Sequence, residues 1–372
     1  MKTLTAAILI VITTFAFAQD PGAAIARFAE LGIVHNNAPI DADNIGNIQS
    51  LRISGDAGNQ LTDQDVLHLA AIPRLGHLTI GSAPQLTPAG LAHLAGIEGL
   101  WNLNFRAAGL TDEQVSALAG LDGLRSLDLA LNRQVTDAAL PAIASIGGLE
   151  TLTLDSTAVT DAGLGSLASH PTLQRVSVLQ TAITDAGLEH LGTISGLRSL
   201  GLSGSQIRGS GFVHLAGLSR LEEISAQNLQ LGDSSMELLA SVPSLQRLYV
   251  WDNDLTDAAT TWLASLPNLR TLYLDNNDIT DAGVVAFAGH ESLSNLWLSG
   301  TQVTDAGLAA LTDTVLEQVM LHRTAVTDEG LLTLVGIPTM RNIQARDSQI
   351  TETGVEAAMA VEGRHERLQI RR

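Results

Sequence analysis

One pattern recurs along most of the chain at a fixed period of about 24 residues. A representative copy, residues 269–289, has the sequence LRTLYLDNNDITDAGVVAFAG. A period in this range indicates a stacked array of units, because a single unit cannot bury its apolar face alone. Most copies carry a threonine at the same phase: Thr62, Thr87, Thr111, Thr136, Thr160, Thr184, Thr256, Thr280, Thr304, Thr327 and Thr351. Two further copies have Arg208 and Gly232 at this phase.

Each copy predicts a short strand followed by a short helix. In residues 269–274, apolar and other side chains alternate, so the leucines face inward while Thr271 and Tyr273 face outward. Thr280 followed by Asp281 is typical of a helix start, where the hydroxyl caps a free N–H and the acid faces the positive end of the helix dipole. Val284 and Phe287 then form one apolar face of the helix. Stacking buries the leucines and this face together.

These repeats resemble the leucine-rich repeat family, specifically the bacterial TDxGLxxL type with a period of about 24 residues. They are also similar to the repeats of F-box-associated proteins, although this chain has no cysteine and no F-box precedes its repeats. The resemblance implies an α/β solenoid, a horseshoe with parallel strands on the concave face and short helices on the convex face. It also implies a binding scaffold that has no catalytic activity.

The first residues predict export from the cytoplasm. Residues 1–18, MKTLTAAILIVITTFAFA, combine a lysine, an apolar run and small residues before Gln19. This is typical of a cleavable signal peptide and too short for a membrane span. We therefore expect a secreted or periplasmic protein with a signal peptide at 1–18, an N-terminal cap at 19–47 and about 13–14 repeats at 48–372. No later stretch predicts a membrane span.

The cap is predicted from a segment that lacks the repeat pattern. Ala24, Ile25, Phe28 and Leu31 form one face of a short amphipathic helix, which Gly32 is placed to end. We expect residues 33–35 to form a hairpin with residues 48–53, leading into the first repeat. Such a cap would shield the open end of the stacked core.

Composition narrows the classes of partner and of chemistry. The formal net charge is −19, which argues against binding to nucleic acids or anionic membranes. The sequence contains no phosphate-binding loop, no nucleophile elbow and no His/Cys metal motif. We therefore predict neither an enzyme nor a cofactor or metal site. The acids that follow the repeated threonines are interpreted as helix-start residues forming an acidic row along one rim: Asp63, Asp112, Asp137, Asp161, Asp185, Asp233, Asp257, Asp281, Asp305, Asp328 and Glu352.

A binding face can be predicted as columns of residues, because alternate strand residues face the concave surface. The central column is predicted to be Arg52, Thr79, Asn104, Asp128, Thr153, Ser177, Gly201, Ser225, Tyr249, Tyr273, Trp297, Met320, Gln344 and Gln369. Tyr249, Tyr273 and Trp297 are three consecutive members of this column, in a chain with only 3% aromatic residues. The next column adds Trp251, Asp275, His322, Arg346 and Arg371. Aromatic residues beside arginine are typical of binding hot spots.

Two ligand classes remain open for this surface. We predict a protein or peptide partner on the concave face, anchored by Tyr249, Trp251, Tyr273 and Trp297 and oriented by Asp275, His322 and Arg346. The alternative is a glycan or cell-wall polymer stacked on the rings. A third interpretation is structural, with neighbouring rings stabilising the sheet by packing against one another. The last strand could also pair with a second copy of the chain.

Overall fold

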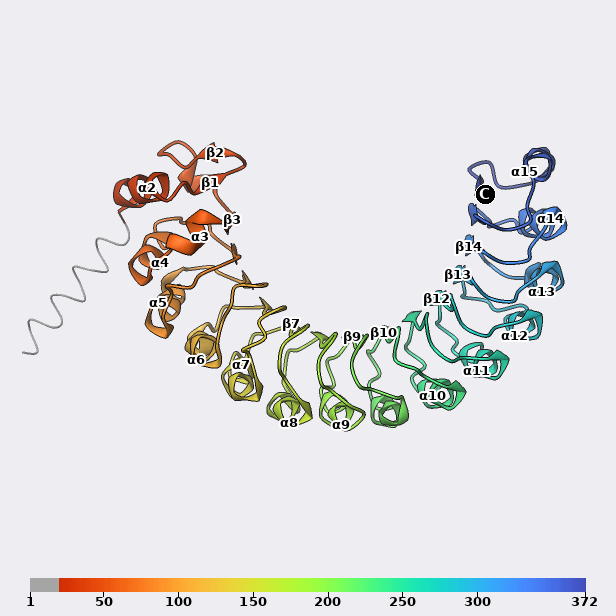
Figure 1. Ribbon diagram of the computed structural model, residues 1–372, viewed down its shortest axis with the longest axis horizontal. Coiled ribbons are helices and arrows are strands. Elements are labelled where there is room, and N and C mark those ends of the chain that lie inside the picture. The colour runs from red at the N-terminus through yellow and green to blue at the C-terminus, as the bar shows by residue number, and fades with distance from the viewer. Residues whose placement is uncertain (1–19) are drawn as a thin grey trace, which may run out of the picture. The chain divides into compact units, whose positions relative to one another are not determined.

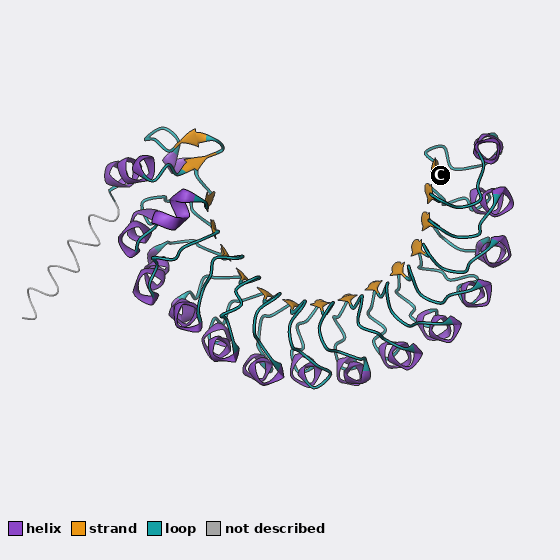
Figure 2. Cartoon of the chain, viewed as in Figure 1, coloured by secondary structure: helices purple, strands orange, loops and turns teal. Residues whose placement is uncertain are grey.

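A computed structural model describes residues 20–372 of the protein. The predicted signal peptide at residues 1–18 lies outside the described residues. The chain divides into two compact units, Met1–Ala182 and Ile183–Arg372. In each unit the strands line the inner side and the helices form the outer side (Figure 2). No helix in residues 20–372 is long and apolar enough to cross a bilayer.

The first unit contains six of the parallel strands, each beside its neighbours in sequence (Figure 1). The strands are β3 (Ser50–Ile53), β4 (His77–Ile80), β5 (Asn102–Asn104), β6 (Ser126–Asp128), β7 (Thr151–Thr153) and β8 (Arg175–Ser177). The α-helices are α2 (Pro21–Glu30), α3 (Asp56–Gln60), α4 (Asp63–Leu69), α5 (Pro88–Ala92), α6 (Asp112–Ser116), α7 (Leu140–Ala144) and α8 (Asp161–Leu164). Short 3-10 helices cover Ile45–Asn47, His93–Gly96, Ala117–Gly120, Asp137–Ala139 and Gly165–Leu167.

The second unit continues the same architecture with eight parallel strands. The strands are β9 (Ser199–Gly201), β10 (Glu223–Ser225), β11 (Arg247–Tyr249), β12 (Thr271–Tyr273), β13 (Asn295–Trp297), β14 (Gln318–Met320), β15 (Asn342–Gln344) and β16 (Gln369–Arg371). The α-helices are α9 (Gly187–Leu191), α10 (Asp233–Leu239), α11 (Asp257–Leu263), α12 (Asp281–Val285), α13 (Asp305–Leu308), α14 (Asp328–Val335) and α15 (Glu352–Met359). Two 3-10 helices cover Ser210–Leu215 and Ala309–Leu311.

The core of each repeat lies between its strand and its helix, as the sequence predicts. In the representative copy, Leu272, Val284 and Phe287 are fully buried. Tyr273 on the same strand is partly exposed, which confirms the predicted alternation. The hydroxyl of Thr280 accepts a hydrogen bond from the backbone N–H of Ala282 and caps α12. The predicted solenoid of parallel strands and short helices is confirmed.

The repeated Thr-Asp step joins neighbouring repeats as well as starting helices. The carboxylate of Asp257 accepts hydrogen bonds from the backbone N–H of Thr280 (2.8 Å) and from its hydroxyl (2.5 Å), one repeat further on. Gly283 leaves room for this contact, since a Cβ there would lie 2.3 Å from Asp257 Oδ1. The same pairs recur in both units as Asp63–Thr87, Asp112–Thr136, Asp137–Thr160, Asp233–Thr256, Asp281–Thr304, Asp305–Thr327 and Asp328–Thr351. The acidic row is therefore a ladder of hydrogen bonds between repeats.

The N-terminal segment forms a helix and a hairpin ahead of the first repeat strand. Helix α2 ends as predicted near Gly32, whose φ is +67°, and it buries Ala24 and Phe28. The predicted hairpin is wrong in its second strand. Strand β1 (Val34–His35) pairs antiparallel with β2 (Ala38–Pro39), whereas β3 pairs parallel with β4. The two asparagines between β1 and β2 both have positive φ, which lets the chain reverse within two residues.

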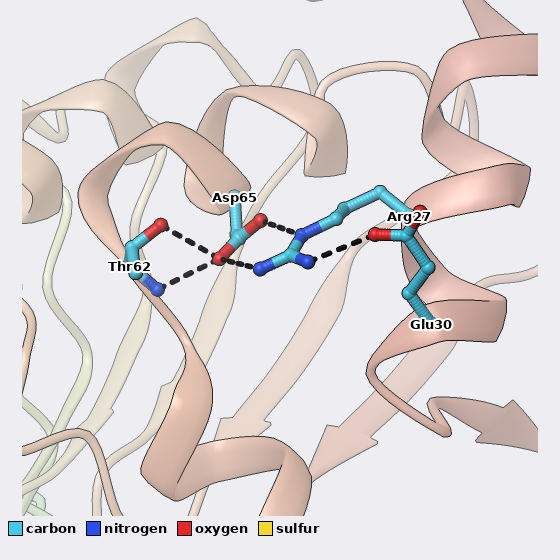
Figure 3. Close-up of polar contacts among 4 residues, drawn as sticks. All are labelled: Arg27, Glu30, Thr62 and Asp65. Atoms are coloured by element: carbon cyan, nitrogen blue, oxygen red, sulfur yellow. Dashed lines mark hydrogen bonds and ion pairs between the residues drawn. The ribbon is translucent and has the colours of Figure 1, made fainter.

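A partly buried ion pair attaches this segment to the first repeat (Figure 3). Arg27 on α2 donates from Nε to Oδ1 of Asp65 on α4 (2.6 Å) and from Nη2 to Oδ2 (3.2 Å). The side chain of Asp65 is only 3% exposed, and it also accepts hydrogen bonds from the backbone and hydroxyl of Thr62. Burial acts to raise the pKa of Asp65, but the hydrogen bonds from Arg27 and Thr62 outweigh it and hold that pKa below its usual value. A carboxylate charged and bonded in this way fixes α2 against α4.

Candidate binding surface

The predicted aromatic column lies on three adjacent strands of the second unit. Tyr249 ends β11 opposite Tyr273 of β12, and Tyr273 lies opposite Trp297 of β13. Trp251 follows two residues after Tyr249 and therefore lies on the same face. We call these four side chains the aromatic stack. Asp275, His322 and Arg346 occupy the next column, and we call them the polar flank.

The register of the last strand differs from the prediction. Arg371 of β16 lies opposite Gln344, so Arg371 and not Gln369 continues the central column. Gln369 lies opposite Asn342. The difference is two residues, which leaves every side chain on the same face of the strand. The alternation of apolar and polar residues therefore fits both registers equally, and only the loop before β16 decides between them.

The rings of the aromatic stack pack closely on one another. Tyr273 and Trp297 are stacked, with ring centroids 4.0 Å apart and planes 8° from parallel. Tyr249 lies 4.8 Å from Tyr273 at a tilt of 39°. Trp251 meets Tyr249 edge-to-face at 6.0 Å and Tyr273 at 5.5 Å. Trp297 is only 7% exposed. Stacking of neighbouring rings is therefore part of sheet packing, and the facing surfaces of Tyr273 and Trp297 are covered.

The partly exposed tyrosines place phenol groups at this surface. Burial raises the pKa of Tyr249, and the charge of Glu223 adds to this effect. Burial likewise raises the pKa of Tyr273, which neighbours Tyr249 and Asp275. Both phenols therefore stay protonated at neutral pH and can donate hydrogen bonds. Beside them, Arg247 Nε and Glu223 form an ion pair of 2.6 Å across β10 and β11.

The polar flank is held by backbone hydrogen bonds. Asp275 Oδ1 accepts from the N–H of Ser299 (2.8 Å), and burial raises the pKa of this carboxyl. Nδ1 of His322 accepts from the N–H of Arg346 (2.8 Å). Burial, and then the positive charge of Arg346, lower the pKa of His322. A neutral imidazole that accepts at Nδ1 carries its proton on Nε2, so we assign that tautomer to His322.

The structure brings most of the predicted residues into one surface. The four rings touch as a group, and His322 binds the backbone of Arg346. The Arg346 side chain is exposed and makes no ion pair with any residue in 20–372. Within the described residues, no group of three His, Cys, Asp or Glu side chains is placed to hold a metal ion.

A second polar row beside this surface escaped the sequence-based columns. Arg323 donates to Asn276 Oδ1 (3.1 Å), and Asn276 donates to Asp252 Oδ1 (2.7 Å). Arg323 reaches across one repeat because Gly300 lies between, where a Cβ would be 2.3 Å from Asn276 Oδ1. These residues lie at one repeat phase in left-handed backbone conformation. Aligning the turn after each strand would have revealed the row.

Comparisons with known proteins agree with this fold. Residues 243–303, which include the aromatic stack, match the leucine rich repeat family model. The crystal structure of an internalin from Listeria monocytogenes is similar, at 21% identity and TM-score 0.63, over 94% of this chain and 93% of that one. The mouse RP105/MD-1 complex is similar at 16% identity and TM-score 0.60, over 87% of this chain and 64% of that one. No curated protein matches the sequence.

Proposed function

We propose that this protein, whose fold is a leucine-rich repeat solenoid, is an exported, non-enzymatic scaffold that binds a protein or peptide partner. The partner would contact the aromatic stack and the polar flank. The observation that supports this proposal is the surface itself. Two phenols and a partly exposed Trp251 form one cluster. The exposed Arg346, which makes no ion pair within residues 20–372, lies further along the same sheet, just after β15. Aromatic and arginine side chains of this kind dominate binding energy at protein interfaces.

Ring geometry favours a protein partner over a glycan at this surface. A sugar that stacks on an aromatic ring needs an open ring face. Tyr273 and Trp297 cover each other's facing surfaces at 4.0 Å, and Trp297 is almost fully buried. The partly exposed side chains of Tyr249, Trp251 and Tyr273 remain, and the two phenol groups suit hydrogen bonds with a peptide. The mouse structure that shares the fold is a complex of RP105 with MD-1.

Two further parts of the proposal concern location and assembly. Secretion or delivery to the periplasm rests on residues 1–18, and N-terminal sequencing of the mature protein tests it by showing whether Gln19 comes first. Pairing of two copies through β16 rests on its position at the end of the strand order. Light scattering of the purified chain distinguishes a monomer from a dimer.

The binding proposal is tested with variants that preserve the stack. The double variant Tyr249→Phe/Tyr273→Phe removes both hydroxyls while keeping the rings, and Arg346→Ser removes the guanidinium. Each immobilised variant is used to capture extracellular proteins from the source organism, beside wild type. Trp262→Ala is the control, because Trp262 is 38% exposed on helix α11, away from the strands.

The expected result is a protein captured by wild type and by the Trp262 variant, and lost or weakened about tenfold in the other two. Capture that is equal in all four proteins would refute binding at the aromatic stack. Retention of a purified polysaccharide that depends on the same hydroxyls would support the glycan alternative instead.

A further inference from the structure

A second aromatic feature lies in the first unit, outside the predicted columns. Trp101 immediately precedes β5 and is 48% exposed, the most exposed of the four tryptophans. Its backbone N–H donates to the carbonyl of Gly76, and the N–H of Gly76 donates to the carbonyl of Gln49. The starts of β3, β4 and β5 therefore place these three residues side by side. The sequence-based columns began inside the strands and so excluded this position.

Trp101 forms one wall of an open hollow with a volume of about 540 Å3. The other lining residues include Gln49, Ser50, Arg74 and His77. Gly76 also lines it, and a Cβ at this position would lie only 2.6 Å from Trp101 Nε1. The ring of His77 packs against the indole at 6.3 Å with planes at 77°. We call this space the Trp101 hollow, and its volume falls in the range of about 300–1,000 Å3 typical of small-ligand sites.

The polar groups of the hollow are available to a ligand. Arg74 is exposed, and its guanidinium makes no ion pair or hydrogen bond with any residue in 20–372. The side chains of Gln49 and Ser50 are also exposed and make no hydrogen bond within the same residues. Arg52, two residues after Ser50 on the same face of β3, adds a second exposed positive charge. In a chain of net charge −19, this surface carries unneutralised positive charge.

We propose that the Trp101 hollow binds an acidic saccharide, a sugar unit that bears a carboxylate. The carboxylate would pair with Arg74, since arginine matches a carboxylate in both charge and geometry. The C–H face of the sugar ring would lie on the exposed indole, whose face is electron-rich. Gln49, Ser50 and Nδ1 of His77 would take the hydroxyls, since Nε2 of His77 already contacts the hydroxyl of Thr79 at 3.4 Å. A saccharide presents an apolar face and a rim of hydroxyls together, as this arrangement requires.

This site is independent of the proposed protein-binding surface. The aromatic stack offers covered ring faces, whereas the indole of Trp101 is half exposed beside free polar groups. The hollow is open, so the next sugar of a chain can leave it without a clash. Failure of saccharide binding would leave the proposal for the aromatic stack unchanged.

The test is binding to an array of saccharides that spans uronic acids, other carboxylated sugars and their neutral counterparts. Isothermal titration with an acidic trisaccharide from the array and its neutral analogue then measures affinity. Trp101→Ala is expected to weaken binding of the acidic trisaccharide by roughly tenfold. Arg74→Gln is expected to weaken it by about threefold while leaving the neutral analogue unaffected. The control Trp262→Ala, an exposed tryptophan on a helix, should change neither affinity.

Three outcomes would overturn the proposal. The first is an array on which wild type retains no acidic saccharide. The second is acidic binding that survives Trp101→Ala with the circular dichroism spectrum unchanged. The third is Arg74→Gln weakening the acidic and neutral trisaccharides equally, which would show that no carboxylate meets Arg74. If Trp101→Ala fails to fold, Trp101→Phe keeps a smaller ring and should bind at intermediate strength.

Discussion

Replacement of Gly283 by alanine should destabilise the protein while Asp257 is present and should be close to neutral once Asp257 is removed. In a helix, alanine is ordinarily more favourable than glycine by about 0.5–1 kcal/mol. At Gly283 the added methyl would lie 2.3 Å from Asp257 Oδ1 and displace the carboxylate from Thr280. Two hydrogen bonds to that carboxylate would be lost. Hydrogen bonds to charged groups contribute about 1.5–3 kcal/mol each, and the partial exposure of this site favours the lower end.

These terms give a double-mutant cycle with a defined outcome. Asp257→Ala alone should lower the free energy of unfolding by about 2–4 kcal/mol, and Gly283→Ala alone by about 1–3 kcal/mol. In the Asp257→Ala background, Gly283→Ala should be close to neutral. The helical gain there opposes a small shift of the Ile279 methyl, which lies 3.0 Å from the added carbon. The coupling between the two positions is then about 2 kcal/mol.

The assay is urea unfolding followed by circular dichroism, with amide hydrogen exchange of α12 measured in parallel. Exchange is included because repeat arrays can open one unit at a time. Additive losses in the double variant would refute the argument, since they would show that the methyl does not act through the carboxylate. Thr280→Val serves as a comparison, because it removes the hydroxyl hydrogen bond to Asp257 together with the cap on Ala282, and keeps the backbone hydrogen bond to Asp257.

Three more predictions follow from buried groups. Because the pKa of Asp65 is lowered in the folded state, its ion pair with Arg27 stabilises the fold at pH values above the unfolded-state pKa of about 3.9, and this stabilisation is lost as pH falls through the folded-state pKa. Asp65→Asn should therefore flatten the dependence of the unfolding free energy on pH over that acid range. A wild-type protein whose unfolding free energy is already independent of pH there would contradict this. Trp297→Ala should cost up to about 3–5 kcal/mol because the ring is stacked and buried, so a variant with unchanged melting would show that the stack adds nothing. Leu272→Ala should cost about 2–5 kcal/mol in urea unfolding, and a smaller loss would mean that the neighbouring repeats close over the cavity.

The burial of Trp297 changes what the sequence alone leads us to expect of a variant at this position. Alternation along β13 places Trp297 outward, from which its removal together with Tyr273 would be expected to leave folding nearly intact. In the structure, Tyr273 covers Trp297 from the neighbouring strand, so the outward position is 7% exposed. Conservative variants that keep the rings are therefore the better probes of binding.

Within one repeat, the sequence by itself determined the structure. Alternating leucines gave the strand, the Thr-Asp step gave the helix start, and apolar spacing gave the buried face, because each depends on neighbours a few residues away. The repetition then fixed the stacking order and the adjacency of Tyr249, Tyr273 and Trp297. The prediction of which side chains share a face held for the strands, since pleating follows from chain geometry alone.

Only the tertiary structure decided what happens between repeats. The hydrogen bonds from Asp257 to Thr280, the stacking of Tyr273 on Trp297 and the register of β16 each depend on where a neighbouring unit lies. The partner in each case lies about one period of 24 residues away, and local propensity says nothing about distances at that separation. The placement of Trp101 was decided in the same way, by Gly76, which immediately precedes the neighbouring strand β4 and leaves space for the indole.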